Sequence, residues 1–285
     1  MSKRILITGA GGFVGDELAR YCSSAGWDVR AFVRSPPTHA IPGVEYVVYD
    51  MESGLYETDF EGVDVLVHCA FVRYERHSTA DDLNVSATRE LIAMCRKREI
   101  RPIYLSSFSA HSGATSHYGR NKLKCEQLFD LSRDLVLRPG LVIGKKGLAA
   151  DMMARIERGG YFPLAGGDKP VQTIAVSDLC RIIERAANTG DSGLYHIAEP
   201  RAVTLKALYA EMAAQLGKKI TFIPVPLSLL YLGCKLSETL GMALPVSSEN
   251  VLGLKHLIKY DTTQDLRTLN VPVRNYQENL KLVLK

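Results

Sequence analysis

The sequence of 285 residues has no apolar run approaching the ~20 residues that cross a bilayer, so we expect no integral membrane segment. It also has no block of like charges. Its net charge of +4 is too small a basic excess to indicate a nucleic-acid-binding protein, although it suits an anionic ligand. The chain starts a strand pattern almost at once, without the apolar core of a signal peptide, which predicts a cytoplasmic protein.

Cysteine is sparse and scattered. The six cysteines form no CxxC pair, and most stand in apolar surroundings. We therefore predict reduced packing residues rather than disulfides or metal ligands, and no metal site. Neither an internal repeat nor a low-complexity stretch interrupts the chain, whose length allows one large domain or a main domain with a smaller one.

Short apolar, β-branched runs alternate with helical patterns over the first 140 residues. Strands are predicted at residues 4–8, 28–33, 44–49, 64–70, 101–107 and 134–140, and helices at 13–25, 81–97 and 118–131. Continuous apolar strands joined by helices indicate a parallel sheet covered on both faces. Right-handed crossovers then give an α/β fold with a doubly wound parallel sheet, the Rossmann fold.

The alternation of strand and helix patterns changes after Gly140. A helix and a Gly/Pro-rich loop come first, followed by a helix at 176–187 with Ser177 as a possible N-cap, a strand at 193–199 and an amphipathic helix ending at Gly217. We predict a Rossmann domain of residues 1–143 plus about 171–198, and a smaller C-terminal α/β substrate domain of about 144–170 plus 199–285. The apolar stretch at 224–254 could pack on that smaller domain, or form a lid, a dimer face or a membrane-surface helix.

Three glycines with GxxGxxG spacing stand between the first strand and the first helix. They are Gly9, Gly12 and Gly15, and Phe13 and Val14 open the helix. Glycines let the backbone turn tightly and approach a pyrophosphate, whose charge the helix N-terminus stabilises. The strand–turn–helix context therefore predicts a dinucleotide site.

Arg34 follows the second strand, where many NAD-binding sites carry an acidic residue. A guanidinium suits a 2′-phosphate in charge and geometry, so we expect NADP in preference to NAD; the alternative is a solvated arginine. Asp50 ends the third strand and could accept a hydrogen bond from the adenine amino group or cap the next turn. The sequence VHCAF ends the fourth strand at the edge where ligands bind.

Tyr118 and Lys122 stand one helical turn apart and share a helix face. A tyrosine with a pKa near 10 is a poor base at neutral pH, but a nearby ammonium and a positive nicotinamide favour its phenolate. Ser107 ends the preceding strand and can hydrogen-bond a substrate oxygen, although Ser106 and Ser109 lie close to it.

At this point the chain resembles the extended or atypical short-chain dehydrogenases/reductases, the NAD-dependent epimerase/dehydratase type. The resemblance rests on TGAGGFVG, Asp50 with Met51, HCA, NVSATREL, LSS, YGRNK, LRPGLVIG and VSDL. It implies that Ser107, Tyr118 and Lys122 are catalytic, with support from Asn84. It also implies that Met51, Cys69, Ala70 and Pro139 lie along the cofactor, and that the protein is a homodimer.

Three functions stay open. The first hypothesis is an NADP-dependent oxidoreductase that interconverts an alcohol and a carbonyl of a small molecule, possibly a nucleotide sugar. The second is a nucleotide-sugar 4-epimerase, which uses the same residues and retains its oxidised cofactor, although Arg34 weighs against it. The third is an NADP-binding redox sensor without turnover. The residues after Ser107 depart from the pattern of sugar-nucleotide members, and Phe108 with Ser109 argues against a 4,6-dehydratase.

Overall fold

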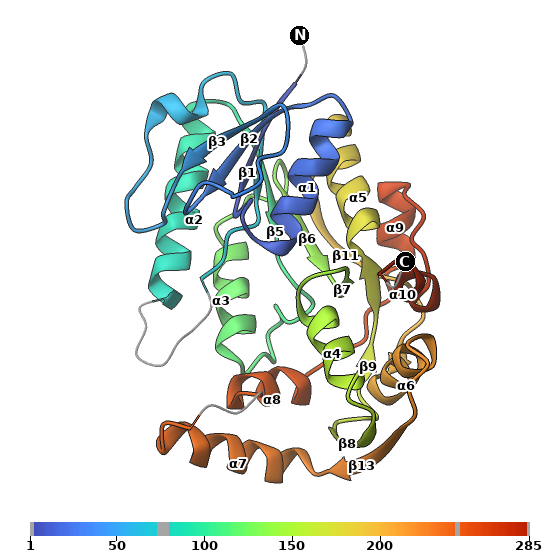
Figure 1. The fold of residues 1–285 in the computed structure, drawn as a ribbon. Coiled ribbons are helices and arrows are strands. Elements are labelled where there is room, and N and C mark those ends of the chain that lie inside the picture. Colours follow the sequence, from blue (N-terminus) through green and yellow to red (C-terminus); the bar gives the residue numbers. More distant parts are fainter. Residues whose placement is uncertain (1–2, 73–79, 243–245, 284–285) are drawn as a thin grey trace.

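Parallel strands flanked by helices form the larger part of the molecule (Figure 1). The computed structural model describes residues 3–72, 80–242 and 246–283. The strands are β1 (Arg4–Thr8), β2 (Asp28–Val33), β3 (Val44–Val48), β4 (Val65–His68), β5 (Arg101–Leu105), β6 (Leu135–Pro139), β7 (Leu141–Ile143), β8 (Gly160–Ala165), β9 (Pro170–Val171), β10 (Thr173–Ala175), β11 (Gly193–Ile197), β12 (Val203–Thr204) and β13 (Ile220–Val225). The helices are α1 (Phe13–Ser24), α2 (Ala80–Lys97), α3 (His117–Glu126), α4 (Leu148–Ile156), α5 (Val176–Thr189), α6 (Leu205–Gln215), α7 (Leu227–Thr239), α8 (Ser248–Lys255), α9 (Thr263–Leu269) and α10 (Tyr276–Val283), with a 3-10 turn at Glu57–Phe60.

The main sheet has seven strands in the order β11-β6-β5-β4-β1-β2-β3. Every pairing in it is parallel. The strand order reverses between β1 and β4, and ligands of such sheets bind outside the carboxyl ends of the strands at that point. The predicted doubly wound sheet is therefore confirmed, and it directs attention to the ends of β1 and β4.

Alternation along the strands fills hydrophobic clusters on both faces of the sheet. Ile5 and Ile7 pack with α1 and α5 on one face of the sheet, whereas Leu6 packs with α2 on the other. Neighbouring β5 and β6 send Tyr104 and Val136 to the face covered by α3. Burial on both faces explains why these strands are continuous apolar runs in the sequence.

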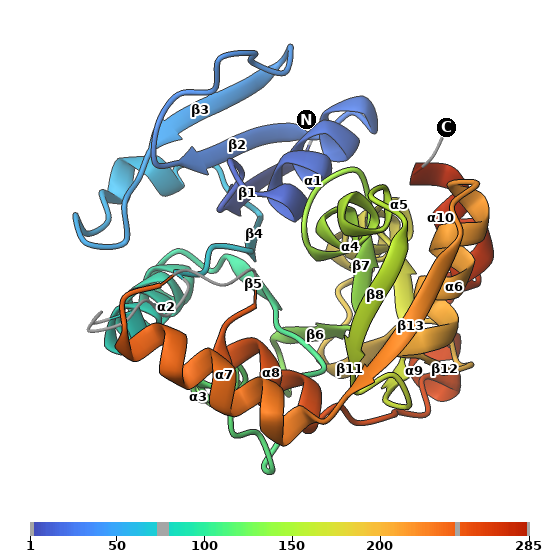
Figure 2. The same cartoon turned by 60° about the horizontal axis from the view of Figure 1, so that its bottom comes forward.

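A smaller α/β region lies beyond the carboxyl edge of the sheet (Figure 2). Its core gathers α4, α6 and α10 around the two-stranded β13-β8 sheet, with Met152, Leu208 and Leu280 inside it. The division of the chain into two domains at the predicted boundaries stays a prediction. No helix in the described part of the chain is long and apolar enough to cross a membrane.

Two local predictions are wrong. The helix expected at 118–131 ends at Glu126, because the chain turns where the Asp134 carboxylate accepts the Asp130 N–H, 2.8 Å away. Ser177 does not cap α5, whose N-cap is Ala175 without a side-chain bond. The Ser177 hydroxyl accepts a hydrogen bond from Arg274 instead, at 2.7 Å.

Arg274 also ties the C-terminal segment to α5 through a buried carboxylate. Asp178 has no exposed surface and accepts hydrogen bonds from the Arg274 backbone N–H at 3.0 Å and its Nε at 3.2 Å. Arg181 donates to the same carboxylate at 3.0 Å. Two guanidinium groups and a backbone donor thus compensate its lost hydration.

Replacing Asp178 with Asn should lower the free energy of unfolding by about 2 kcal/mol, because both arginines lose their charged partner. Urea unfolding measures the change. Glu57→Gln, which breaks an exposed pair with Lys97 and Arg98, is the matched control and should have little effect. Equal stability of Asp178→Asn and the wild type would show that this pairing does not hold the C-terminal segment.

Candidate active site

The turn after β1 approaches β4 more closely than any side chain permits. Gly9 has a φ of +69°, and a Cβ on it would lie 2.7 Å from the Ala70 Cα. A Cβ on Gly15 would lie 2.3 Å from the Gly9 carbonyl oxygen. The start of α1 is thereby held directly against the turn.

The N-terminus of α1 is arranged for an anion. Gly12 is its N-cap, in an extended conformation and without a side-chain hydrogen bond. The backbone N–H groups of the first turn, which includes Phe13 and Val14, are therefore available to a ligand. The Phe13 ring packs so tightly on Gly144 that a Cβ there would lie 2.4 Å from the ring, which joins this turn to the loop after β7.

A buried histidine connects β1, β4 and α2 beneath this turn. His68 Nδ1 lies 2.7 Å from the Thr8 hydroxyl, and Nε2 lies 3.1 Å from the Thr88 hydroxyl. Burial lowers the pKa of His68 to about 3, so the ring is neutral. Thr88 donates its proton to the Asn84 carbonyl and must accept from Nε2–H, which leaves Nδ1 to accept from Thr8.

Lys122 is buried at the carboxyl end of β5. Its Nζ donates to the Leu105 carbonyl at 2.7 Å and lies 4.6 Å from the ring centre of Phe71 and 4.7 Å from that of Tyr104. Burial lowers the pKa of Lys122 to about 8. The ammonium therefore stays charged near neutral pH in a largely apolar site.

Tyr118 stands on the same face of α3 but at the surface, with 39% of it exposed. The Phe71 ring meets the Tyr118 ring edge to face at 5.1 Å. Phe71 thus contacts both members of the YxxxK pair and fixes the space between them. Sequence reasoning did not identify Phe71, although it directly follows HCA.

The three neighbouring serines have different environments. Ser106 is buried and donates to Glu126, which in turn accepts from Arg138 Nε at 2.8 Å. Ser107 is half-buried, and its hydroxyl accepts the Ser109 N–H at 3.1 Å. Ser106 is therefore engaged in the interior, whereas the Ser107 hydroxyl stands at the start of the loop that leads to α3.

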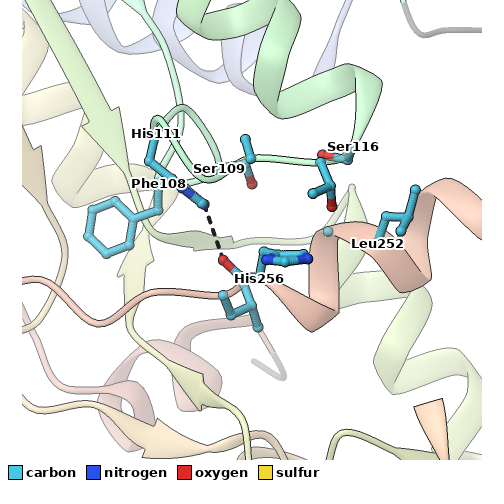
Figure 3. A pocket seen from close by; sticks show the side chains of 10 residues that line it. Phe108, Ser109, His111, Ser116, Leu252 and His256 are labelled. Atoms are coloured by element: carbon cyan, nitrogen blue, oxygen red, sulfur yellow. Dashed lines mark hydrogen bonds between the residues drawn. The ribbon is translucent and has the colours of Figure 1, made fainter. Parts of the chain in front are cut away.

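That loop lies against α8 around a small cavity (Figure 3). The cavity has a volume of about 10 Å³, which is room for one water molecule. His111 Nε2 donates to the His256 carbonyl at 3.1 Å across it. Glu249 of α8 accepts the His117 N–H at 2.6 Å and so caps the first turn of α3. The smaller region thereby fixes the start of the helix that carries Tyr118 and Lys122.

Asn84 holds the chain after β4. Its side-chain amide accepts the Val72 N–H and donates to the Val72 carbonyl, both at 2.9 Å. This pair of bonds positions the segment that includes Phe71. Asn84 thus acts on the site through the backbone of a neighbouring strand end.

The remaining residues named from the sequence lie along the carboxyl edge of the sheet. Cys69 and Ala70 follow β4, and Pro139 ends β6, where its carbonyl accepts the Phe108 N–H at 3.0 Å. Burial raises the pKa of the Cys69 thiol to about 12, so it is no thiolate. The ends of β4 and β6 thus flank the end of β5, where the Lys122 ammonium donates to the Leu105 carbonyl.

Three residues lie further along that edge. Arg34 follows β2, is exposed, and forms no ion pair with any residue that the structure describes. The Asp50 carboxylate accepts the Glu52 N–H at 3.1 Å, so it caps the next turn, as one of its two alternatives expected. Met51 packs against the core beside α2.

Comparison with curated proteins gives distant relatives that align with the chain over different shares of their length. The chain is 24% identical to the N-acetyl-alpha-D-glucosaminyl-diphospho-ditrans,octacis-undecaprenol 4-epimerase of Escherichia coli O157:H7, over 93% of this chain and 89% of that protein. It is 24% identical to the ceramide reductase of Caulobacter vibrioides, over 78% and 73% of the two chains. It also matches an uncharacterized protein of Mycobacterium tuberculosis at 26% identity, of which it spans 24%.

Solved structures share the fold. The UDP-N-acetylglucosamine 4-epimerase of Bacillus cereus superposes with a TM-score of 0.74 at 20% identity, covering 99% of this chain and 98% of the other. MoeE5 in complex with UDP-glucuronic acid and NAD superposes with a TM-score of 0.76 at 21% identity, covering 99% and 97%.

The model of one family, described as the NAD dependent epimerase/dehydratase family, matches residues 5–198. That span includes the Gly-rich turn, the His68 network and the helix with Tyr118 and Lys122. Because the match covers well over half of the sequence and the whole sheet edge described above, the chain belongs to the NAD-dependent epimerase/dehydratase family of extended short-chain dehydrogenases/reductases, enzymes with an NAD(P) cofactor.

Proposed function

We propose that the protein is a 4-epimerase of a sugar carried on a diphosphate. The observation that carries this proposal is the meeting of the uncapped α1 N-terminus with Tyr118 and Lys122 at one sheet edge. The name of the E. coli relative, a 4-epimerase of a diphosphate-linked sugar, supports it. This was the second hypothesis from the sequence, and the comparisons favour it over the net oxidoreductase placed first.

The residues at the edge fit a nicotinamide dinucleotide. The close approach at Gly9 and Gly15 holds the turn against Ala70 and the start of α1, whose N–H groups would bind a pyrophosphate. Arg34 would bind a 2′-phosphate, and we infer NADP as the preferred form, although neighbours such as MoeE5 are described with NAD. Asp50, Met51, Cys69, Ala70 and Pro139 would line the remainder of the groove.

The residues of the chain would remove and return the proton of the reacting hydroxyl. A bound nicotinamide dinucleotide would supply reversible hydride transfer at the sugar carbon. Tyr118, exposed toward solvent, would take the hydroxyl proton as the general base and return it as the acid. The Lys122 ammonium would favour the phenolate form, and Ser107 would donate a hydrogen bond to the sugar oxygen.

Tyr118→Phe should lower the rate of epimer interconversion about a thousandfold, because it removes the proton-transfer group and leaves the ring packed on Phe71. NMR of an equilibrating UDP-N-acetylglucosamine mixture, with no added reductant, measures the rate. Tyr56→Phe, at a tyrosine that is 70% exposed, is the control and should leave the rate unchanged. If Tyr118→Phe keeps the wild-type rate, Tyr118 is not the acid/base.

Lys122→Met should raise the free energy of unfolding at pH 7 by about 2 kcal/mol, because a buried ammonium is removed. The pKa of Lys122 is about 8 in the folded chain, down from 10.5. Between these pH values the unfolded wild type binds more protons than the folded wild type, so its free energy of unfolding rises with pH. The difference in free energy of unfolding between Lys122→Met and the wild type therefore narrows. Urea unfolding at several pH values measures this difference, and Lys124→Met at an exposed lysine is the control. A difference that stays constant with pH would contradict the lowered pKa of Lys122.

Arg34→Glu should weaken binding of NADP about tenfold or more and spare NAD, because the carboxylate repels a 2′-phosphate but can bind a ribose hydroxyl. Calorimetric titration with each dinucleotide measures the two affinities. Arg133→Glu makes the same charge change at another exposed arginine and serves as the control. Unchanged NADP affinity in Arg34→Glu would show that Arg34 is a solvated surface residue that does not bind the 2′-phosphate.

A further inference from the structure

The outward face of α7 is a stripe of leucines. Leu229, Leu232, Leu236 and Leu240 are between 59% and 65% exposed. Their spacing of three and four residues places them on one side of the helix. Met242, 57% exposed, follows them. We call these five residues the α7 stripe.

The inward face of α7 is already occupied. Cys234 and Ser237 are buried, and Glu238 accepts hydrogen bonds from the Ser248 N–H at 2.7 Å and its hydroxyl at 2.9 Å. α8 is the one described element against which α7 packs extensively, and both lie at the edge of the molecule (Figures 1 and 2). The α7 stripe therefore faces away from the rest of the described chain.

The stripe is large enough to be an interaction site. Five half-exposed side chains present on the order of 500 Å² of apolar surface, a size that marks an interaction site. A standard protein interface buries roughly 800 Å² per partner, of which little more than half is apolar, so the charges beside the stripe rather than its area identify the occupant. Insertion of a few leucines into a bilayer adds to electrostatic attraction.

The charges around α7 complement an anionic bilayer. Between positions 218 and 260 the sequence has five lysines and two glutamates. Both glutamates are partly buried and bound within the chain: Glu238 accepts hydrogen bonds from Ser248 and pairs with Lys235 at 3.6 Å, and Glu249 accepts the His117 N–H. Lys235, beside the stripe, is half-exposed, and Lys255 and Lys259 are exposed. Basic residues next to exposed leucines are the combination that binds anionic lipid surfaces.

We propose that the α7 stripe docks the protein on an anionic lipid bilayer, with α7 lying in the interface rather than crossing it. α8 lies between α7 and α3, and its Glu249 caps the first turn of the helix that carries Tyr118 (Figure 1). Docking therefore sets the active-site edge one helix away from the membrane surface. The proposal concerns the position of the protein and does not depend on its reaction.

The test is flotation of the full chain with vesicles of phosphatidylcholine and phosphatidylglycerol in equal parts, and with vesicles of phosphatidylcholine alone. The wild type should float with the mixed vesicles. The double variant Leu232→Ser, Leu236→Ser should bind at least about tenfold more weakly, because two insertions are lost. The control is Leu131→Ser, Leu282→Ser, two leucines that are 44% and 42% exposed elsewhere, and it should float like the wild type.

Three outcomes overturn the proposal. They are equal flotation of the stripe variant and the wild type, failure of the wild type to float, and equal binding to both kinds of vesicle. Light scattering after gel filtration identifies the alternative occupant: a wild-type dimer that the stripe variant turns into a monomer, without vesicle binding, assigns the stripe to a second copy. Circular dichroism melts of both variants ensure that a loss of binding is not a loss of folding.

Discussion

The contact between the Gly9 turn and the end of β4 determines most of this structure. Two backbones meet there at a separation that no side chain allows, and this places the start of α1 against the carboxyl edge of the sheet. The same edge receives the chain after β4, with Phe71, and the end of β5, with Lys122 below it. The uncapped N-terminus of α1 and the Tyr118–Lys122 pair therefore lie at the same edge of the sheet, where the strand order reverses between β1 and β4.

Burial gives this edge its chemical character. Lys122 has a backbone carbonyl and two aromatic rings around it, so its charge is poorly hydrated and its pKa falls. Tyr118, one turn earlier on the same helix, is open to solvent. A single helical turn therefore spans the interior and the surface, which is the arrangement that the proposed acid/base role of Tyr118 beside a buried cation requires.

Local sequence patterns predicted the strands, the order of the elements and the glycines, because continuous apolar runs and GxxGxxG spacing are local features. They also placed Tyr118 and Lys122 on one helix face. They could not find Glu249, which caps α3 from 132 positions further along the chain, since that contact depends on tertiary packing. Helix α3 was predicted too long because the turn after it depends on Asp134, whose partner Arg96 comes from another helix. The exposure of the apolar 224–254 segment likewise depends on which face of α7 meets α8.

The hydrogen-bonded chain through His68 has a direction. Ala70 N–H donates to Thr8, Thr8 to Nδ1, Nε2–H to Thr88, and Thr88 to the Asn84 carbonyl. Its two ends are a backbone N–H, which can only donate, and a backbone carbonyl, which can only accept. The donor and acceptor of any single hydrogen bond in between therefore cannot be exchanged. The imidazole is consequently held in a single tautomer, with Nε2 as the donor and Nδ1 as the acceptor. The neutral ring joins the end of β4 to Thr88 of α2 by a hydrogen bond that does not change with pH, down to the acidic range where the ring itself accepts a proton.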